Sequence, residues 1–349
     1  MRGSRAPGRR GREGLKAALA SAWAPREAKL LVALLAICLA ITLREPRFLQ
    51  ASNLEQVALS GTLVCIVALG QALLIIGRQI DLSVGAIVAW SAFVSALWLS
   101  QHPDASLALV FVIGIAVGAA LGAGNALLAA GLRIPAIVAT LGTLAIYRGG
   151  IIVYAGGRQI SATVLPDRYG AIAQTHILGQ SPLVWIALAL TLVLGWLARN
   201  TRTGRNVYAI GSNPEGAEFS GIGVRRHVAL LFVLSGMLCG LTGVLWGARF
   251  GTVDAVIGPD LQLQSISAAV VGGVSIFGGS GSVYGAAIGA AIFVVLQNGV
   301  QLLGFDQFWI PALLGAAILG TVLLYSRLAN RAGAPTGSNR SSGRGKVAS

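Results

Sequence analysis

The sequence predicts an all-α integral membrane protein of about ten transmembrane helices, and three observations support this class. Of the 349 residues, 55% are hydrophobic and only 11% are charged, whereas soluble domains carry about 25% charged residues. Several apolar stretches reach the roughly 20 residues that a helix needs to cross a bilayer. The basic residues gather at the two ends and in one central loop, as membrane topology requires.

Apolar stretches define the expected helices in chain order, with a polar connection after each. The eighth is short and rich in glycine, which predicts a broken or re-entrant segment. The ten stretches cover residues 29–43, 57–76, 84–100, 107–131, 135–155, 182–198, 228–248, 264–278, 283–304 and 308–325.

The polar parts of the chain divide it into a central domain and two tails. A basic tail over 1–28 precedes a transmembrane domain over 29–326, which contains a polar loop over 199–227. The first apolar stretch is followed by further apolar stretches and not by a polar mature domain, so we interpret it as a retained helix. The composition of residues 327–349, rich in glycine, serine and arginine, predicts a disordered tail.

The distribution of basic residues predicts the orientation. If the N-terminus is cytoplasmic, ten spans place 20 of the lysines and arginines on the cytoplasmic side and 6 on the other. Both tails are basic, which requires an even number of spans. We therefore expect both termini and the 199–227 loop in the cytoplasm.

Glycines recur at every fourth position in several of the expected helices. Such small-residue tracks let helix backbones approach closely inside a bilayer, so they predict tight packing within the bundle or a dimer. The tracks comprise Gly114, Gly118 and Gly122, then Gly281, Gly285 and Gly289, and the pairs Gly236/Gly240 and Gly243/Gly247.

Two weakly similar stretches, 75–92 and 270–287, each run from an apolar segment through a glycine-rich polar break into another apolar segment. If they are equivalent points of two five-span halves, the odd number of spans makes the repeat inverted. This hypothesis gives the protein a 5+5 inverted repeat.

Sequence motifs of enzymes are missing from the chain. It has no phosphate-binding loop, dinucleotide fingerprint, HExxH zinc motif or nucleophile elbow, so we expect no catalytic residues, no cofactor and no metal site. The net charge is +14, but the basic residues are not interleaved with aromatic residues, which argues against nucleic-acid binding. Arg148 is the one charge within an expected span, and we expect it to reach outward to the interface in preference to a wet interior.

The central loop contains the signals of a short helix. Asn213-Pro214 marks a turn, and residues 215–219 follow it as one or two helical turns. A short helix in a loop between spans predicts a surface that docks on a partner.

Four stretches resemble the inner-membrane permeases of bacterial ABC importers for monosaccharides, the ribose-type group, over nearly all of residues 30–326. The residues before the first stretch, Gly77-Arg78-Gln79, and the run from Ser275 to Gly281 lean toward the rhamnose and autoinducer-2 branches. The four stretches are Ile80–Gly85 (IDLSVG), Gly124-Asn125 with Ile134-Pro135, Ala139–Thr143 and Arg148-Gly149, Gly204–Ile222, and Gly272–Gly281 with Gly285 and Gly289.

The resemblance implies a permease in the bacterial inner membrane that works with other subunits. These are a separate ATP-binding subunit in the cytoplasm, a periplasmic or lipid-anchored solute-binding protein, and a second permease copy, identical or different. The alternative from the residues themselves is an ion-coupled secondary carrier, although no mid-membrane pair of acids favours it.

The resemblance also implies two sets of site residues. The loop that couples to the ATP-binding subunit comprises Gly204, Arg205, Gly211, Asn213, Pro214, Glu215, Ala217, Glu218, Ser220 and Gly221. The candidates for the solute pathway are Asp81, Ser83, Gly85, Asn125, Thr140, Thr143, Gly272, Gly273, Gly278 and Gly279.

Several pathway candidates also have a structural interpretation. Asp81 and Ser83 either cap the helix that follows or shape the inner mouth of a pathway, and we favour capping. Asn125, Thr140 and Thr143 either offer hydrogen bonds to a solute or tie helices together, and we favour the second role.

Overall fold

The computed structural model describes residues 25–320 apart from 307, 311, 313–314 and 317–318. The tails predicted over 1–28 and 327–349 therefore lie almost wholly outside the described residues, as does most of the tenth stretch, 308–325. The helices are α2 (Pro25–Arg44), α3 (Ala51–Ile76), α4 (Val84–Gln101), α5 (Leu107–Ala126), α6 (Ala136–Ala155), α7 (Asp167–Gln174), α8 (Pro182–Asn200), α9 (Arg202–Ser212), α10 (Pro214–Phe219), α11 (Val224–Phe250), α12 (Leu261–Val271) and α13 (Val283–Leu302).

Single-turn elements extend or connect these helices. Two 3₁₀ turns, η1 (Pro46–Leu49) and η3 (Ala162–Val164), lie in connections, and a π-helical turn, η2 (Leu127–Gly131), extends α5. The described part of the chain contains no strand longer than an isolated bridge. The predicted all-α class is confirmed.

Seven of the described helices are long and apolar enough to cross a membrane, namely α3, α4, α5 with η2, α6, α8, α11 and α13. The first expected span is α2, which has 20 residues but carries charged residues near both ends. The eighth is α12, which has only 11 residues and ends at Val271. It is therefore shorter than the predicted 264–278, because the backbone leaves the helix at Gly272.

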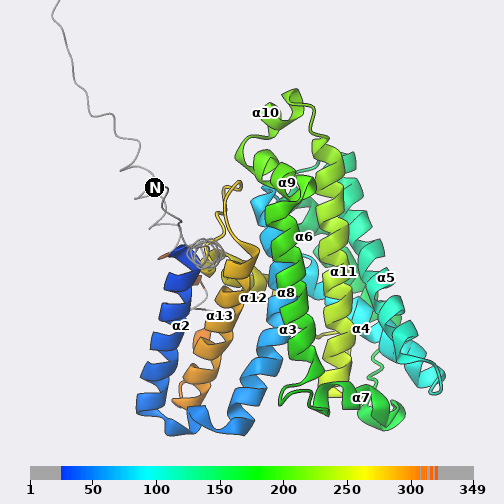
Figure 1. Cartoon of the computed structure of the whole chain (residues 1–349). Coiled ribbons are helices and arrows are strands. Elements are labelled where there is room, and N and C mark those ends of the chain that lie inside the picture. Colours follow the sequence, from blue (N-terminus) through cyan, green and yellow to red (C-terminus); the bar gives the residue numbers. More distant parts are fainter. Residues whose placement is uncertain (1–24, 307, 311, 313–314, 317–318, 321–349) are drawn as a thin grey trace, which may run out of the picture.

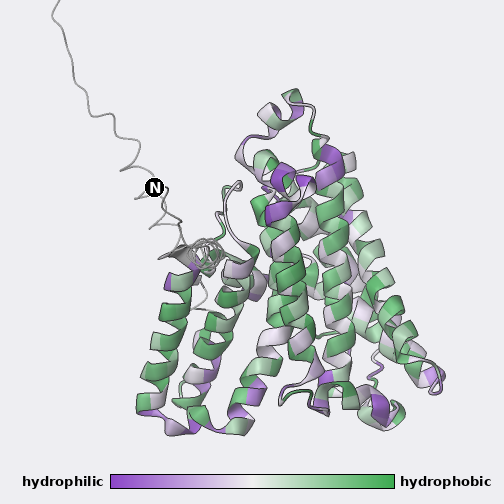
Figure 2. Ribbon diagram, viewed as in Figure 1, coloured by the Kyte–Doolittle hydropathy of each residue, from purple (hydrophilic) through white to green (hydrophobic). Residues whose placement is uncertain are grey.

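The helices form one bundle with its polar residues concentrated at the two ends (Figure 2). Helices α9 and α10 cover one end and α7 covers the other, while α2 and α13 stand side by side at the edge (Figure 1). The chain passes from α10 directly into α11, so α11 begins at the end of the bundle where α3 finishes.

Glycine tracks hold α5 against α11, as the spacing predicted. A Cβ atom on Gly118 would overlap the carbonyl oxygen of Gly236, and one on Gly122 would overlap that of Phe232. In α13, a Cβ atom on Gly289 would likewise overlap the carbonyl oxygen of Ala268 in α12. These tracks pack helices within one chain.

The two stretches taken as equivalent points of a repeat lie at the same end of the bundle. The amide of Gly279 donates a hydrogen bond to the carbonyl of Ile76, 2.9 Å away. In an inverted repeat, a segment at one end of the bundle has its equivalent at the opposite end, so the pairing of 75–92 with 270–287 is wrong. The similarity reflects two glycine-rich turns that meet.

A different pair of connections has the geometry of opposed halves. Helix α3 leads through residues 77–83 into α4, and α11, which runs in the opposite direction, leads through residues 251–260 into α12. The starts of α4 and α12 meet, because a Cβ atom on Gly85 would overlap the carbonyl oxygen of Gly258 and lie 3.0 Å from Oε1 of Gln262.

Candidate functional site

The short helix predicted after Asn213-Pro214 is present as α10. Asn213 is its N-cap, and the Asn213 side chain accepts a hydrogen bond from the amide of Gly216 at 3.0 Å. Pro214 occupies the first helical position, where its missing N–H costs no hydrogen bond. Gly221, with φ of 78°, ends the helix, and the amide of Ile222 returns to the carbonyl of Ala217 at 3.0 Å.

Helix α10 presents an acidic and aromatic surface to solvent. Glu215 and Glu218 are exposed, whereas Ala217 faces inward and is buried. Glu215 in the first turn complements the positive end of the helix dipole. Phe219 is 93% exposed and was missed in the sequence analysis, although an aromatic residue within a polar loop was the signal that could have identified it.

The preceding helix, α9, connects α10 rigidly to the bundle. Thr201 caps α9 by accepting a hydrogen bond from the amide of Gly204 at 3.1 Å. A side chain on Gly204 would overlap the carbonyl oxygens of Leu197 and Ala198, and Arg205 donates to the carbonyl of Asn200 at 3.1 Å.

Gly211, near the end of α9, touches two other segments through its backbone. A Cβ atom there would overlap the carbonyl oxygen of Ile76 and the amide nitrogen of Gly279. Glycine is therefore required at this junction, since any side chain would separate α9 from α3 and from the α12–α13 connection.

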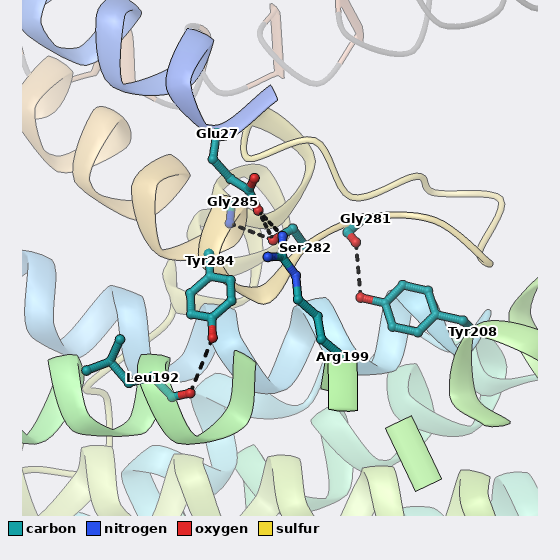
Figure 3. Close-up of polar contacts among 8 residues, drawn as sticks. All are labelled: Glu27, Leu192, Arg199, Tyr208, Gly281, Ser282, Tyr284 and Gly285. Carbon is teal, nitrogen blue, oxygen red and sulfur yellow. Dashed lines mark hydrogen bonds and ion pairs between the residues drawn. The ribbon is translucent and has the colours of Figure 1, made fainter. Parts of the chain in front are cut away.

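A cluster of polar contacts joins the end of α8 to the starts of α2 and α13 (Figure 3). Oε1 of Glu27 accepts hydrogen bonds from Nη2 of Arg199 at 2.5 Å and from the hydroxyl of Ser282 at 2.6 Å. The Ser282 hydroxyl also caps α13 by accepting from the amide of Gly285 at 3.3 Å. The Arg199 guanidinium lies 5.0 Å from the centroid of the Tyr284 ring.

Tyr208 of α9 extends this cluster (Figure 3). Its hydroxyl donates to the carbonyl of Gly281 at 3.1 Å. Burial raises the pKa of the Tyr208 hydroxyl, which keeps it protonated and able to donate.

A second polar cluster is fully buried where the chain passes from α3 to α4. The carboxyl of Asp81, with 0% exposure, accepts hydrogen bonds from the amide and hydroxyl of Ser83 at 2.8 and 2.7 Å. Nδ2 of Asn125 in α5 donates to Asp81 at 3.1 Å and to Ser83 at 2.8 Å. Gln71 donates to the Asp81 carbonyl at 3.2 Å. These contacts tie α3, α4 and α5 together.

The expected capping role of Ser83 is wrong in its details. Ser83 occupies the N-cap position of α4, but its side chain accepts no capping hydrogen bond. The nearby Asp81 carboxyl draws the Ser83 hydroxyl away as a donor, because a buried carboxyl needs its acceptor sites filled. Neither of these side chains bonds to the amides of the first turn of α4.

The threonines of α6 bond mainly to backbone. The Thr140 hydroxyl lies 2.8 Å from the carbonyl of Ala136 and 3.3 Å from that of Ile80, which links α6 to the connection before α4. The Thr143 hydroxyl donates to the carbonyl of Thr140 at 3.3 Å.

The late glycine block makes close backbone contacts. A side chain on Gly272 would overlap the carbonyl oxygen of Gly285, and Gly273 has φ of 88°. Gly278 and Gly279, with φ of 84° and 71°, face Gly211 and Ser212 of α9. This block lies far from the Asp81 cluster in the sequence, but it also approaches the connection that carries Asp81, because a Cβ atom on Gly278 would lie 3.0 Å from Cβ of Arg78.

The half-buried Arg148 side chain finds its hydrogen-bond partners within the protein. Its Nη1 donates to the carbonyls of Ala255 and Ile257 at 3.1 and 2.9 Å, so it braces the connection between α11 and α12. Two backbone carbonyls of this irregular connection thus serve as acceptors for Arg148, whereas its depth relative to the bilayer interface stays a prediction.

Among the described residues, no three His, Cys, Asp or Glu side chains are grouped closely enough to hold a metal ion.

Comparison with known proteins identifies the family. Residues 53–326 match the family described as branched-chain amino acid transport system, permease component. The chain belongs to this permease family. The permease is 36% identical over 303 residues to the autoinducer 2 import system permease protein LsrC of Klebsiella pneumoniae, with 87% of each chain covered. The corresponding LsrC proteins of Enterobacter sp. (strain 638) and Salmonella typhi are 35% and 32% identical over 303 residues. The two alignments cover 87% and 86% of these relatives, respectively, and each covers 87% of the permease.

No solved structure matches the permease. The resemblance to importer permeases, and within them to the autoinducer-2 branch, is confirmed by these relatives. The permease is thus a transport component and not itself an enzyme.

Proposed function

We propose that the permease is the membrane-spanning subunit of an ATP-driven importer for autoinducer-2 or a related monosaccharide. The observation that carries this proposal is the alignment with autoinducer-2 import permeases over 303 residues. The family match over residues 53–326 takes in the Asp81 cluster and α10. Ribose, rhamnose and other pentoses or hexoses belong to the same class of small polyhydroxylated solutes.

The proposed topology has ten membrane segments in two inverted halves of five, with both termini in the cytoplasm of a bacterial inner membrane. Helix α12 is the short eighth segment, and the tenth, predicted over 308–325, lies mostly outside the described residues. The opposed α3–α4 and α11–α12 connections support this inversion. The concentration of arginines around α9 and α10 supports a cytoplasmic position for that end.

The proposed partners follow from this topology. A separate ATP-binding subunit contacts α10, a periplasmic or lipid-anchored binding protein delivers the solute, and a second permease copy completes the pathway within the bilayer. The exposed acids Glu215 and Glu218, with the rigid support of α9, make α10 the coupling helix in this proposal.

For the pathway we propose the region where the starts of α4 and α12 meet. Broken helices whose N-termini converge near the middle of a bundle are a recurrent design of transporter sites. Gly85 permits the close approach of α4 to the start of α12. The cluster of Asp81, Ser83 and Asn125 holds the start of α4 in place. Thr140 of α6 contacts the connection before α4 through the carbonyl of Ile80, and Thr143 bonds to the carbonyl of Thr140 one turn away.

Uptake in proteoliposomes tests the proposal. The permease is reconstituted with its proposed ATP-binding subunit and binding protein, and labelled autoinducer-2, ribose, rhamnose and leucine are compared. We expect uptake of autoinducer-2, ribose or rhamnose. This uptake should require ATP on the side of the membrane where the ATP-binding subunit lies, and it should continue in the presence of a protonophore. Leucine uptake alone would contradict the proposed solute class.

An ion-coupled carrier is the second candidate, and the burial of Asp81 favours it. A buried acid in a membrane domain is a default candidate for ion binding. Asp81→Asn keeps an oxygen that can accept from Ser83 but removes the charge. ATP-driven import predicts that the variant retains uptake, whereas an ion-coupled carrier predicts that uptake and protonophore sensitivity are lost together.

A further inference from the structure

The connection between α12 and α13, residues 272–282, forms a compact turn that we name the hook. The amide of Gly278 donates to the carbonyl of Ser275 at 3.0 Å, and the amide of Ser275 donates to the carbonyl of Ser280 at 2.9 Å. Phe277 lies within this turn and is 62% exposed. The hook thus carries a large aromatic side chain that the permease itself does not cover.

The hook is fixed on several sides. Gly279 donates to the carbonyl of Ile76. Gly281 accepts from Tyr208, and Ser282 donates to Glu27 (Figure 3). A segment held in place loses little conformational freedom when it binds a partner, so more of the contact energy remains for affinity.

The hook is continuous with the surface that presents α10. A Cβ atom on Gly278 would lie 2.9 Å from the carbonyl oxygen of Gly211, and one on Gly279 would overlap Ser212. Ser212 directly precedes Asn213, the N-cap of α10. In Figure 1 the hook rises beyond the start of α2 and reaches the level of α9.

The charges beneath the hook argue for a protein partner. Glu27 and Arg199 lie at its base, and charged side chains are rare within the hydrocarbon layer and are concentrated near its boundaries. The turn extends beyond this charged layer, where a phenylalanine meets water unless a protein covers it. Exposed aromatic residues on rigid supports are typical anchors of protein interfaces.

We propose that Phe277 of the hook is a second docking point for the ATP-binding subunit, beside α10 and its exposed Phe219. This inference rests on the proposed function, because it assumes that the same subunit approaches this end. The hook and the α9–α10 segment touch each other at Gly211, so contacts from both would fix the orientation of the ATP-binding subunit. A contact with the six-residue helix α10 alone would let the subunit rotate.

Photo-crosslinking in the assembled importer tests the inference. Benzoylphenylalanine is placed at position 277, at 219 and, as the matched control, at 305, where another phenylalanine is 61% exposed after α13 at the opposite end. We expect adducts with the ATP-binding subunit from positions 277 and 219 and none from 305.

The other outcomes separate this inference from the proposed function. Position 219 could form an adduct with the ATP-binding subunit while position 277 reacts only with lipid or with a second permease copy. This result overturns the inference and is consistent with the proposed function. Adducts with the ATP-binding subunit from neither position overturn both.

Substitution gives an independent measure. Phe277→Ala is expected to weaken binding of the ATP-binding subunit to the purified permease by about tenfold, while Phe277→Leu retains most of it and Phe305→Ala changes nothing. Thermal unfolding of each variant shows whether the permease is still folded. Wild-type binding by a folded Phe277→Ala variant would refute the proposed contact.

Discussion

Arg199 at the end of α8 and Glu27 in the first turn of α2 form an ion pair with 2.5 Å between Nη2 and Oε1. Glu27 is only 4% exposed, and the same oxygen accepts the hydroxyl of Ser282. One carboxylate therefore joins three helices at the end of the bundle from which α9 and α10 extend. If α8 moves at this end, α2 and α13 must move with it or the contacts to Glu27 break.

Removal of Arg199 is expected to destabilise the permease. Breaking a buried ion pair costs about 3–5 kcal/mol, and the partial exposure of Arg199 reduces the expected loss for Arg199→Ala to about 1–3 kcal/mol. Thermal unfolding in detergent measures the effect. In a Glu27→Gln background the same substitution should cost less, because the unpaired charge is gone. The exposed pair of Arg47 and Glu45 is the control, and Arg47→Ala should leave the unfolding temperature unchanged.

Gly118→Ala tests the contact between α5 and α11. A methyl group there would overlap the carbonyl of Gly236, and such overpacking typically costs about 1–3 kcal/mol. Gly142→Ala in α6 is the matched control, since its Cβ would meet nothing within 4 Å. The control should be neutral or slightly stabilising because alanine favours helix. Equal unfolding temperatures for the two variants would contradict the packing.

Arg148→Ala is expected to loosen residues 251–260. The substitution leaves the carbonyls of Ala255 and Ile257 without their donor, at a cost of about 1–3 kcal/mol. Hydrogen exchange followed by mass spectrometry should show faster exchange in this segment. Arg158→Ala provides the comparison, since Arg158 lies just after α6 and donates to the carbonyls of Ala155 and Tyr154 at the end of that helix. Unchanged exchange at 251–260 in the Arg148 variant would rule out the bracing role.

Charge reversal on α10 tests the coupling helix. Glu215→Lys with Glu218→Lys places two positive charges on a surface that we propose to face the ATP-binding subunit. We expect co-purification of that subunit to fall about tenfold or more, as for central interface residues, while the permease still folds because both side chains are exposed. Asp104→Lys, an exposed acid after α4, should have no effect. Normal assembly and uptake with both reversals would exclude this role for α10.

The sequence by itself determined the membrane class, most of the helices, the short helix after Asn213-Pro214 and the glycine tracks. These features depend on composition and on spacing within one segment, so they can be read locally. The family resemblance was also carried by short motifs, each contiguous in the chain.

Only the tertiary structure decided which distant residues meet. Glu27 and Arg199 are 172 residues apart, and Asn125 reaches Asp81 from another helix. The burial of Asp81, the bracing role of Arg148 and the meeting of the hook with α9 all depend on how helices are placed, which the pattern within each helix does not encode. The pairing of 75–92 with 270–287 failed for the same reason. Similar sequences were taken for symmetry, whereas the two turns contact each other at one end of the bundle.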